Sequence, residues 1–270
     1  MKIDAGLFGP GSASWQVHGE LTVLFGGARA LLMQSAHPLV IAGARETGFY
    51  LRSPWKRLNR TLLLNYLITF GTTEEARAAA EHINVVHRRV HGVDPVTGQA
   101  YHGLDPDLLL WVHATLVESA LLFEKLTVGK LDAAGRQRFH EEQMKVAELL
   151  ELPREKVPPT VDELTTYMRD LEAGDTLVVT DAARTVAGLM RSAPPEAEWK
   201  PVVRLASWWA FASLPPKLRE AYGVTWSRPK EAAVRASLAG MKAVRPFIPR
   251  RYRRLLIAEA ARLRVSAEPD

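Results

Sequence analysis

Two histidines four residues apart are the first side chains in this sequence whose types and spacing could do chemistry. They are His87 and His91, in the stretch NVVHRRVHG at residues 84–92. On a helix, residues four apart share one face, so both imidazoles could bind a single metal ion. The pair could also supply one haem ligand and a bystander, or be two surface histidines near a helix end.

The acidic partners that common two-histidine metal sites require are absent. A zincin needs His-Glu-x-x-His, but Arg88 follows His87. A ferritin-like di-iron site needs a glutamate three residues before its ligand histidines. The residues three positions before the eight histidines are Trp15, Gln34, Ala79, Asn84, Arg88, Gln99, Leu110 and Gln137. The options that remain are haem, an unusual mononuclear site, or no metal.

His113 lies in a very apolar stretch, LLLWVHATLV at residues 108–117. A buried imidazole needs a hydrogen-bond partner or a metal. His113 is therefore either a core histidine that is hydrogen-bonded within the protein or a metal ligand. His91 lies near the expected end of a helix, where a cation is favoured, so capping of that helix explains it.

Arg57, Arg60 and Thr61 are spaced i, i+3 and i+4, so they share one face of a further expected helix. Leucines flank them on both sides. A basic stripe that faces solvent is one explanation. The alternative is a site for an anion or oxyanion, or the polar side of a cofactor pocket.

The composition is that of an ordinary soluble globular protein, since 47% of the 270 residues are hydrophobic and 24% are charged. Cysteine is absent, which excludes disulfides, iron–sulfur clusters, thiolate haem ligation and zinc ribbons. We see no signal-peptide-like apolar segment at the N-terminus, and no run approaches the roughly 18 apolar residues of a membrane span. We therefore expect a cytoplasmic protein without a transmembrane segment.

The formal net charge is +5 and the isoelectric point is near 9.5. Five of the arginines crowd the C-terminal segment, at positions 245, 250, 251, 253 and 254. We expect them to form the solvated face of a terminal helix. The alternative is a patch that binds an anionic surface or nucleic acid, although no nucleic-acid partner is expected.

Helical periodicity dominates the chain, which predicts an all-α fold in a single domain over residues 1–270. Gly26 and Gly27 interrupt the first expected helix and indicate the close approach of a flat group or, more simply, of another helix. The helix that begins at Asp105 is apolar nearly all round and should be central. Residues 93–103 should form a loop, and residues 157–160 and 192–201 should be linkers. Helices are expected over residues 14–36, 54–71, 72–92, 105–126, 132–151, 161–173, 181–192, 201–213 and 229–243, with a last one after Pro249.

Four motifs together resemble the latex-clearing-protein or rubber-oxygenase catalytic domain family, which includes a fungal oxygenase of mycophenolic acid biosynthesis. They are QSAHPLVIAG (34–43), RLNRT (57–61), INVVHRRVHG (83–92) and DPDLLLWVHATL (105–116), with a weaker echo in FHEEQ (139–143). The resemblance covers about residues 15–210 and leaves residues 211–270 as a C-terminal helical extension. It implies a multi-helix bundle that encloses a b-type haem and activates dioxygen.

The resemblance also implies roles for single residues. His87 matches the histidine that is the proximal iron ligand in the latex-clearing branch. Arg57, Arg60 and Thr61 match a distal Arg-x-x-Lys-Thr motif in which Arg60 replaces the lysine. A lysine can become a neutral sixth iron ligand, whereas an arginine stays protonated. Arg57 and Arg60 could still stabilise negative charge that develops on dioxygen, and Thr61 could donate a hydrogen bond to it, in a water-poor pocket.

His113 and His37 match other recurrent positions of the family, which places them beside the iron ligand or at a haem propionate. His113 is the alternative candidate for the iron ligand itself. Glu46 is the nearest acid upstream of the arginines and could act as a base, although no motif supports that role.

The function implied is that of a haem-b-dependent oxygenase or oxidase that uses dioxygen on a small apolar organic substrate. Rubber itself is not the expected substrate, because a polymer outside the cell would require secretion. The alternative is a non-catalytic haem- or oxygen-binding protein, or a scaffold that has lost its cofactor. A nucleic-acid-binding module would rest on the C-terminal arginines alone. The sequence permits an oligomer and identifies neither the substrate nor the electron donor.

Overall fold

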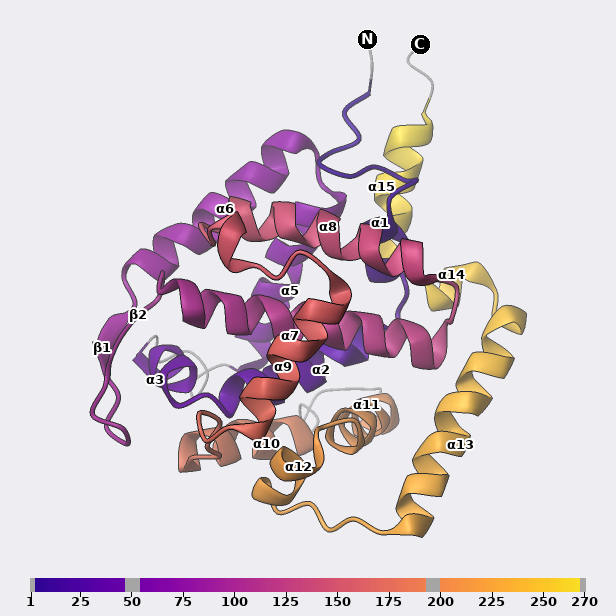
Figure 1. The fold of residues 1–270 in the computed structure, drawn as a ribbon. Coiled ribbons are helices and arrows are strands. Elements are labelled where there is room, and N and C mark those ends of the chain that lie inside the picture. Colours follow the sequence, from indigo (N-terminus) through magenta and orange to yellow (C-terminus); the bar gives the residue numbers. More distant parts are fainter. Residues whose placement is uncertain (1–2, 47–53, 193–199, 268–270) are drawn as a thin grey trace.

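The computed structural model describes residues 3–46, 54–192 and 200–267. These residues form fourteen α-helices and one small two-stranded sheet (Figure 1). The all-α prediction is therefore confirmed.

The elements follow one another along the chain with short connections. They are α1 (Ala13–His18), α2 (Leu24–Ser35), α3 (Pro38–Glu46), α5 (Pro54–Phe70), α6 (Thr73–Arg88), β1 (His91–Val93), β2 (Ala100–His102), α7 (Pro106–Thr127), α8 (Ala133–Leu149), α9 (Val161–Ala173), α10 (Asp181–Arg191), α11 (Lys200–Ala212), α12 (Pro216–Ala221), α13 (Arg228–Val244), α14 (Arg250–Arg253) and α15 (Leu256–Ser266). Two single 3-10 turns lie at Arg154–Lys156 and Arg245–Phe247.

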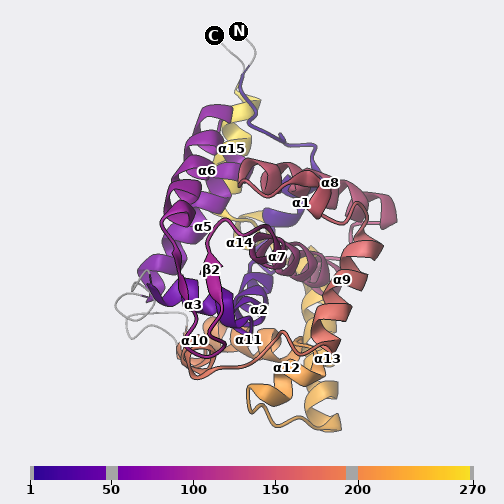
Figure 2. The same ribbon diagram turned by 60° about the vertical axis from the view of Figure 1, so that its left-hand side comes forward.

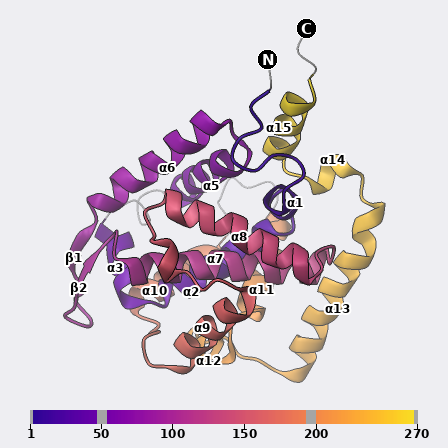
Figure 3. The ribbon, with the colours of Figure 1, turned by 45° about the horizontal axis from the view of Figure 1, so that its top comes forward.

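Helix α7 is the central element, as its apolar sequence predicts. Asp105 caps its N-terminus and Pro106 occupies its first turn. The helix crosses the middle of the molecule and packs against α2, α8, α9 and α13 (Figures 1 and 3). By length and hydropathy alone α7 could span a membrane, but 56% of its most apolar window is buried inside the fold. That burial is typical of the core helix of a globular protein.

The segment predicted as one helix over residues 14–36 is in fact two helices, and this prediction was wrong. Between α1 and α2 the chain pairs with the C-terminal segment instead of continuing its helix. The backbone amide of Leu21 donates to the carbonyl of Arg253 (2.8 Å), and the amide of Leu255 donates to the carbonyl of Gly19 (3.0 Å). This pairing uses a backbone N–H and a backbone C=O group that would be hydrogen-bonded within the helix if the helix were continuous.

The two glycines of α2 differ in their surroundings. A Cβ on Gly26 would lie 2.7 Å from the carbonyl oxygen of Ser119, so α2 and α7 are in close contact there. The simpler explanation, tight helix packing, therefore holds for Gly26. A Cβ on Gly27 would meet no atom within 4 Å, because that position faces open space.

Helix α6 ends at Arg88, four residues earlier than predicted, and the expected loop over residues 93–103 contains a β-hairpin. His91 pairs with His102 across strands β1 and β2, so its assignment as a helix cap was wrong. Close packing favours the hairpin, since a Cβ on Gly92 would lie 2.6 Å from the hydroxyl of Tyr101. A Cβ on Gly103 would lie even closer to the backbone carbonyl oxygen of His87.

The C-terminal arginines do not form the solvated face that was expected. Arg245 is 4% exposed and bonds to the buried carboxylate of Glu20, which also contacts Arg254 and Arg253. Of the five arginines between residues 245 and 254, Arg250 and Arg251 are exposed. Among the predicted linkers, residues 157–160 lead into the cap of α9 at Thr160. Most of the linker 192–201 lies outside the described residues.

Candidate functional site

Helices α5 and α6 form an antiparallel hairpin that brings two of the family-like motifs together (Figure 2). A capping box between Thr72 and Glu75 starts α6 directly after the turn at Gly71. Farther along the hairpin, Nη2 of Arg60 lies 2.5 Å from Nε2 of His82. This contact shows that RLNRT lies beside the half of α6 that carries His87.

The three residues of the expected distal group do not share one environment. Arg57 is half-buried, and its Nη1 donates to the carbonyl of Ala44 at 3.1 Å, which ties α5 to α3. Arg60 and Thr61 are both exposed. The described residues therefore do not form a water-poor pocket around Arg60 and Thr61, contrary to the expectation. Residues 47–53, which directly precede α5, lie outside the described part of the chain.

His87 lies near the end of α6 and is half-buried. Its Nδ1 is buried and has no hydrogen-bond partner. Burial lowers the pKa of His87, and the nearby carboxylate of Glu151 opposes this effect. The imidazole is thereby held in the neutral form, which is the form that binds a metal.

His113 has the same character on helix α7. Its Nε2 is buried without a partner, and burial lowers its pKa to about 3, with a further contribution from His140. His140, on α8, is fully buried; its Nε2 lies 2.7 Å from the carbonyl of Pro158 and its Nδ1 has no partner. The sequence indicated His113 but gave His140 no role, and the only signal for it was the weak FHEEQ echo.

His37 begins the turn into α3 and is 8% exposed. Its Nδ1 is buried without a partner, and burial lowers its pKa while the carboxylate of Asp105 opposes that shift. Buried polar atoms in proteins are nearly always hydrogen-bonded. Unpartnered ring nitrogens on His37, His87, His113 and His140 therefore mark these side chains as candidates for binding a group other than the chain itself.

His18, on α1, is a half-buried histidine without an assigned role. Burial lowers its pKa to about 4, and its ring packs on Phe139 with 5.3 Å between centroids. The ring contact with Phe139 places His18 beside α8, the helix that also carries His140.

Glu46 is not placed to act as a base. It is exposed, and one carboxylate oxygen accepts from the backbone amide of His91 and from the hydroxyl of Tyr101, both at 3.2 Å. Glu46 therefore ties the β1–β2 hairpin to the end of α3.

A metal held by side chains alone has no support in the described residues, because no three His, Asp or Glu side chains in residues 3–46, 54–192 and 200–267 lie close enough to share an ion. An iron on His87 would need its other ligands from a macrocycle. Apolar side chains that could contact such a group are exposed on the α5–α6 hairpin. Val86 and Leu63, on the same helical hairpin, expose 41% and 51% of their surface, and an apolar ring could cover side chains of this kind.

Comparison with known proteins gives one significant match. Residues 15–244 match a family model described as "ER-bound oxygenase mpaB/B'/Rubber oxygenase, catalytic domain". The matched stretch extends past residue 210 through α13. It contains the six residues that the resemblance assigns to the site, which are His37, Arg57, Arg60, Thr61, His87 and His113. No curated protein and no solved structure matches the chain significantly.

Proposed function

The chain belongs to the mpaB/B' and rubber oxygenase catalytic domain family, and we propose that it is a haem-b-dependent oxygenase acting with dioxygen on a small apolar organic substrate. The observation that carries the haem assignment is the state of His87. It is a neutral, half-buried imidazole whose buried Nδ1 has no partner, in a motif that resembles the family's iron-ligand segment.

His87 would hold the iron, and burial lowers its pKa, which favours the neutral form that can bind a metal. A haem bound there supplies the redox centre at which dioxygen is activated. The protein's share of the chemistry is to orient that group, to exclude water and to place charged donors near it.

Arg57 and Arg60 are the donors that this chain offers from the neighbouring helix. Their guanidinium groups are cationic donors, so they would stabilise negative charge on dioxygen or on a carboxylate of a cofactor held beside them. The bond from Arg57 to the carbonyl of Ala44 and the contact of Arg60 with His82 orient the two side chains. Thr61 offers a hydroxyl on the same helix face as a hydrogen-bond donor.

We place His37 and His113 beside the cofactor, and His113 remains the alternative iron ligand. Its pKa near 3 keeps it neutral under any physiological condition. An apolar substrate agrees with the exposed side chains of Leu63 and Val86 on the α5–α6 hairpin. The cytoplasmic location and the small size of the substrate stay predictions, which cell fractionation and substrate profiling would test.

The competing function is that of a haem- or oxygen-binding protein without catalysis. Two measurements on the purified chain separate the alternatives: haem content after extraction into alkaline pyridine, and oxygen consumption with a reductant and a panel of apolar olefins. The proposal predicts stoichiometric haem and substrate-dependent oxygen uptake. Haem without oxygen uptake on any substrate favours the binding protein, and a chain that takes up no added hemin contradicts both.

A further inference from the structure

The three most exposed large apolar side chains among the described residues lie in the C-terminal segment. Phe247, Leu256 and Leu263 are 85%, 83% and 72% exposed, and Tyr252 between them is also exposed. Helices α14 and α15, which carry three of these four residues, lie at the edge of the molecule (Figures 1 and 3). Single apolar residues scattered over a surface are ordinary, but a group of this kind in one segment marks an interaction site.

Helix α15 has apolar residues on two opposite faces. Ala258 and Ala261 are buried in a cluster with Trp15. Leu256 and Leu263 are seven residues apart, so they lie two turns apart on the opposite face of the helix. The helix therefore packs one apolar face against the fold and exposes a second one to solvent.

Positive charge dominates the same segment. Residues 242–267 contain eight lysines and arginines but only one acid, Glu259. That acid is already paired, with Arg250 at 3.0 Å and Arg254 at 3.6 Å. The surface that this segment forms is therefore cationic at neutral pH.

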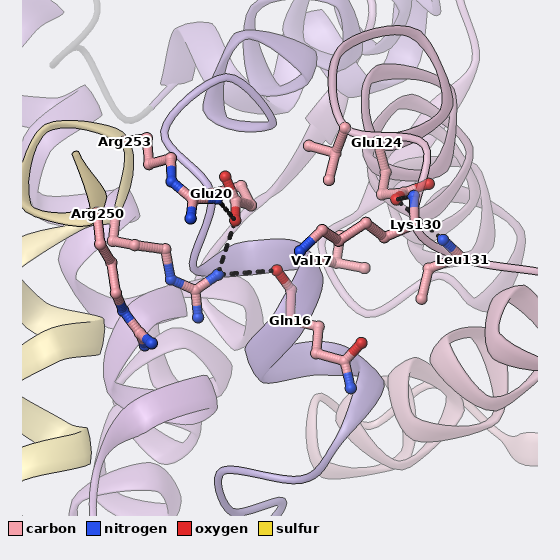
Figure 4. Close-up of a pocket in the computed structure, with 10 residues that line it drawn as sticks. Gln16, Val17, Glu20, Glu124, Lys130, Leu131, Arg250 and Arg253 are labelled. Atoms are coloured by element: carbon pink, nitrogen blue, oxygen red, sulfur yellow. Dashed lines mark hydrogen bonds and ion pairs between the residues drawn. The ribbon is translucent and has the colours of Figure 1, made fainter. Parts of the chain in front are cut away.

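Some of the arginines hold the segment to the rest of the fold. Arg245, Arg253 and Arg254 contact the buried carboxylate of Glu20. Figure 4 shows Arg253 beside Glu20, where the segment meets α1. Backbone hydrogen bonds to the connection between α1 and α2 add to this attachment. The exposed apolar side chains are therefore carried by a backbone that is fixed to the core.

Other arginines face solvent beside the apolar side chains. Arg251 and Arg262 are exposed, and no carboxylate in the described part of the chain pairs with either. Arg251 lies over the ring of Tyr252, with 4.7 Å between the guanidinium carbon and the ring centroid. Cationic and apolar groups thus alternate along the exposed side of this segment.

A surface that is both apolar and cationic fits an anionic lipid bilayer. The apolar side chains can enter the boundary between headgroups and acyl chains while the arginines contact lipid phosphates. A second copy of the chain fits less well, because two such surfaces would bring like charges together. Duplex nucleic acid offers phosphates, but its backbone offers no apolar layer for the exposed leucines.

We propose that residues 247–263 dock the protein on the surface of a membrane that contains anionic phospholipids. Phe247, Tyr252, Leu256 and Leu263 enter the interface, and Arg251 and Arg262 contact the lipid phosphates. Helix α15 has 11 residues, which is too short to cross a bilayer, so it lies on the surface. The docking surface follows residues 15–244, the stretch that matches the family model, and docking requires no haem.

Cosedimentation of the full chain with lipid vesicles tests the proposal. One set of vesicles contains phosphatidylcholine alone, and in the other about a third of the lipid is phosphatidylserine, which gives an anionic surface. The chain should bind the phosphatidylserine vesicles at least about tenfold more tightly, because exposed cations contact the anionic headgroups. Equal binding to both kinds of vesicle, or binding to neither, would overturn the proposal.

A pair of charge-reversal variants separates a local surface from an effect of net charge. Arg251→Glu should weaken binding to the phosphatidylserine vesicles about tenfold. Arg204→Glu, at an exposed position of α11, changes the net charge by the same amount and should leave binding nearly unchanged. An equal loss in the two variants would show that net charge alone attracts the chain, and would contradict the docking surface.

A second pair of variants tests the apolar contribution. Phe247→Ala should weaken vesicle binding about tenfold, whereas Val96→Ala, at an exposed apolar position between β1 and β2, should not. Because both side chains are exposed, neither change removes a core contact. A dimer in sedimentation velocity that Phe247→Ala dissociates would assign the surface to a second copy and overturn the proposal. So would tighter binding to duplex DNA than to the vesicles, if Arg251→Glu abolished it.

Discussion

The guanidinium of Arg60 and the imidazole of His82 lie 2.5 Å apart, Nη2 to Nε2, and join helix α5 to helix α6. Both residues are exposed. The contact aligns the helix that carries the RLNRT motif with the helix that carries His87. It also gives Arg60 a specific partner in this chain.

Arg60→Ala should separate a structural role from a role in oxygen chemistry. The contact is exposed, so we expect the free energy of unfolding to fall by less than about 1 kcal/mol. If Arg60 stabilises charge on dioxygen, substrate-dependent oxygen uptake should fall at least tenfold. Lys56→Ala, which removes an exposed cation from the same helix, is the control and should change neither quantity. Unchanged oxygen uptake in Arg60→Ala would show that Arg60 has no role in oxygen chemistry and only connects α5 to α6.

The two adjacent glycines of α2 predict opposite effects of the same substitution. Gly26→Ala would place its Cβ 2.7 Å from the carbonyl oxygen of Ser119 and should lower the unfolding free energy by about 1–3 kcal/mol. Gly27→Ala meets no atom and should raise it by about 0.5–1 kcal/mol, because alanine favours the helix. Urea unfolding measures both. The same sign for both variants would contradict the packing of α2 on α7.

The buried ion pair between Glu20 and Arg245 can be broken from either side, and the two substitutions should lower the unfolding free energy by different amounts. Glu20→Gln removes the negative charge that Arg245, Arg253 and Arg254 share, so we expect a loss of about 3–5 kcal/mol. Arg245→Met leaves Glu20 with Arg254 at 3.1 Å and should be milder, at about 1–3 kcal/mol. Thermal unfolding of the two variants, with Glu231→Gln at the exposed pair of Glu231 with Arg235 as control, would show this order. Arg245→Met as the more harmful change would refute the shared role of Glu20.

The low pKa of His113 predicts part of the acid sensitivity of the fold. Its pKa is about 3 in the folded chain against 6.5 for an ordinary histidine. Above pH 6.5 the imidazole of His113 is neutral in both the folded and the unfolded chain. Its full contribution to the unfolding free energy is therefore present there. As the pH falls below 6.5, only the unfolded chain takes up this proton, and stability is lost until the pH nears 3.

Between pH 7.5 and pH 5.0 this one group should account for a loss of up to about 2 kcal/mol. His113→Gln removes the titration, so its unfolding free energy should depend on pH less steeply by that amount. Urea unfolding at the two pH values measures the difference, in which any constant effect of the substitution cancels. Identical pH dependence in both proteins would show that His113 is not desolvated as the structure has it.

Elements set by local signals were predictable from the sequence. Helix α9 has the bounds expected, because Thr160 caps its start and Gly174 follows its end. The proximity of RLNRT and His87 also follows from local order, since the two helices are joined by a short turn at Gly71. Pairings between distant segments were not predictable. The break after His18 depends on residues 253–255, and the burial of Arg245 depends on Glu20, which lies 225 positions away.

The same division applies to the candidate site. The family resemblance selected His37 and His87, and the apolar context of His113 selected it as well; in each the structure finds a buried ring nitrogen without a partner. The sequence could not reveal that His140 helps to lower the pKa of His113, because that effect requires α8 to fold onto α7. Nor could spacing show that Arg60 and Thr61 are exposed, since the helix pattern defines a shared face but not what covers it.

The absorption spectrum of the purified chain tests the central claim most directly, with His87→Ala and His91→Ala as a matched pair on one short segment. His91 is exposed in β1 and contacts His102, so it serves as the control. The account predicts a Soret band in the wild-type chain and in His91→Ala, and its loss or marked shift in His87→Ala. A colourless wild-type chain that takes up no hemin, or a Soret band unaltered in His87→Ala, would contradict it.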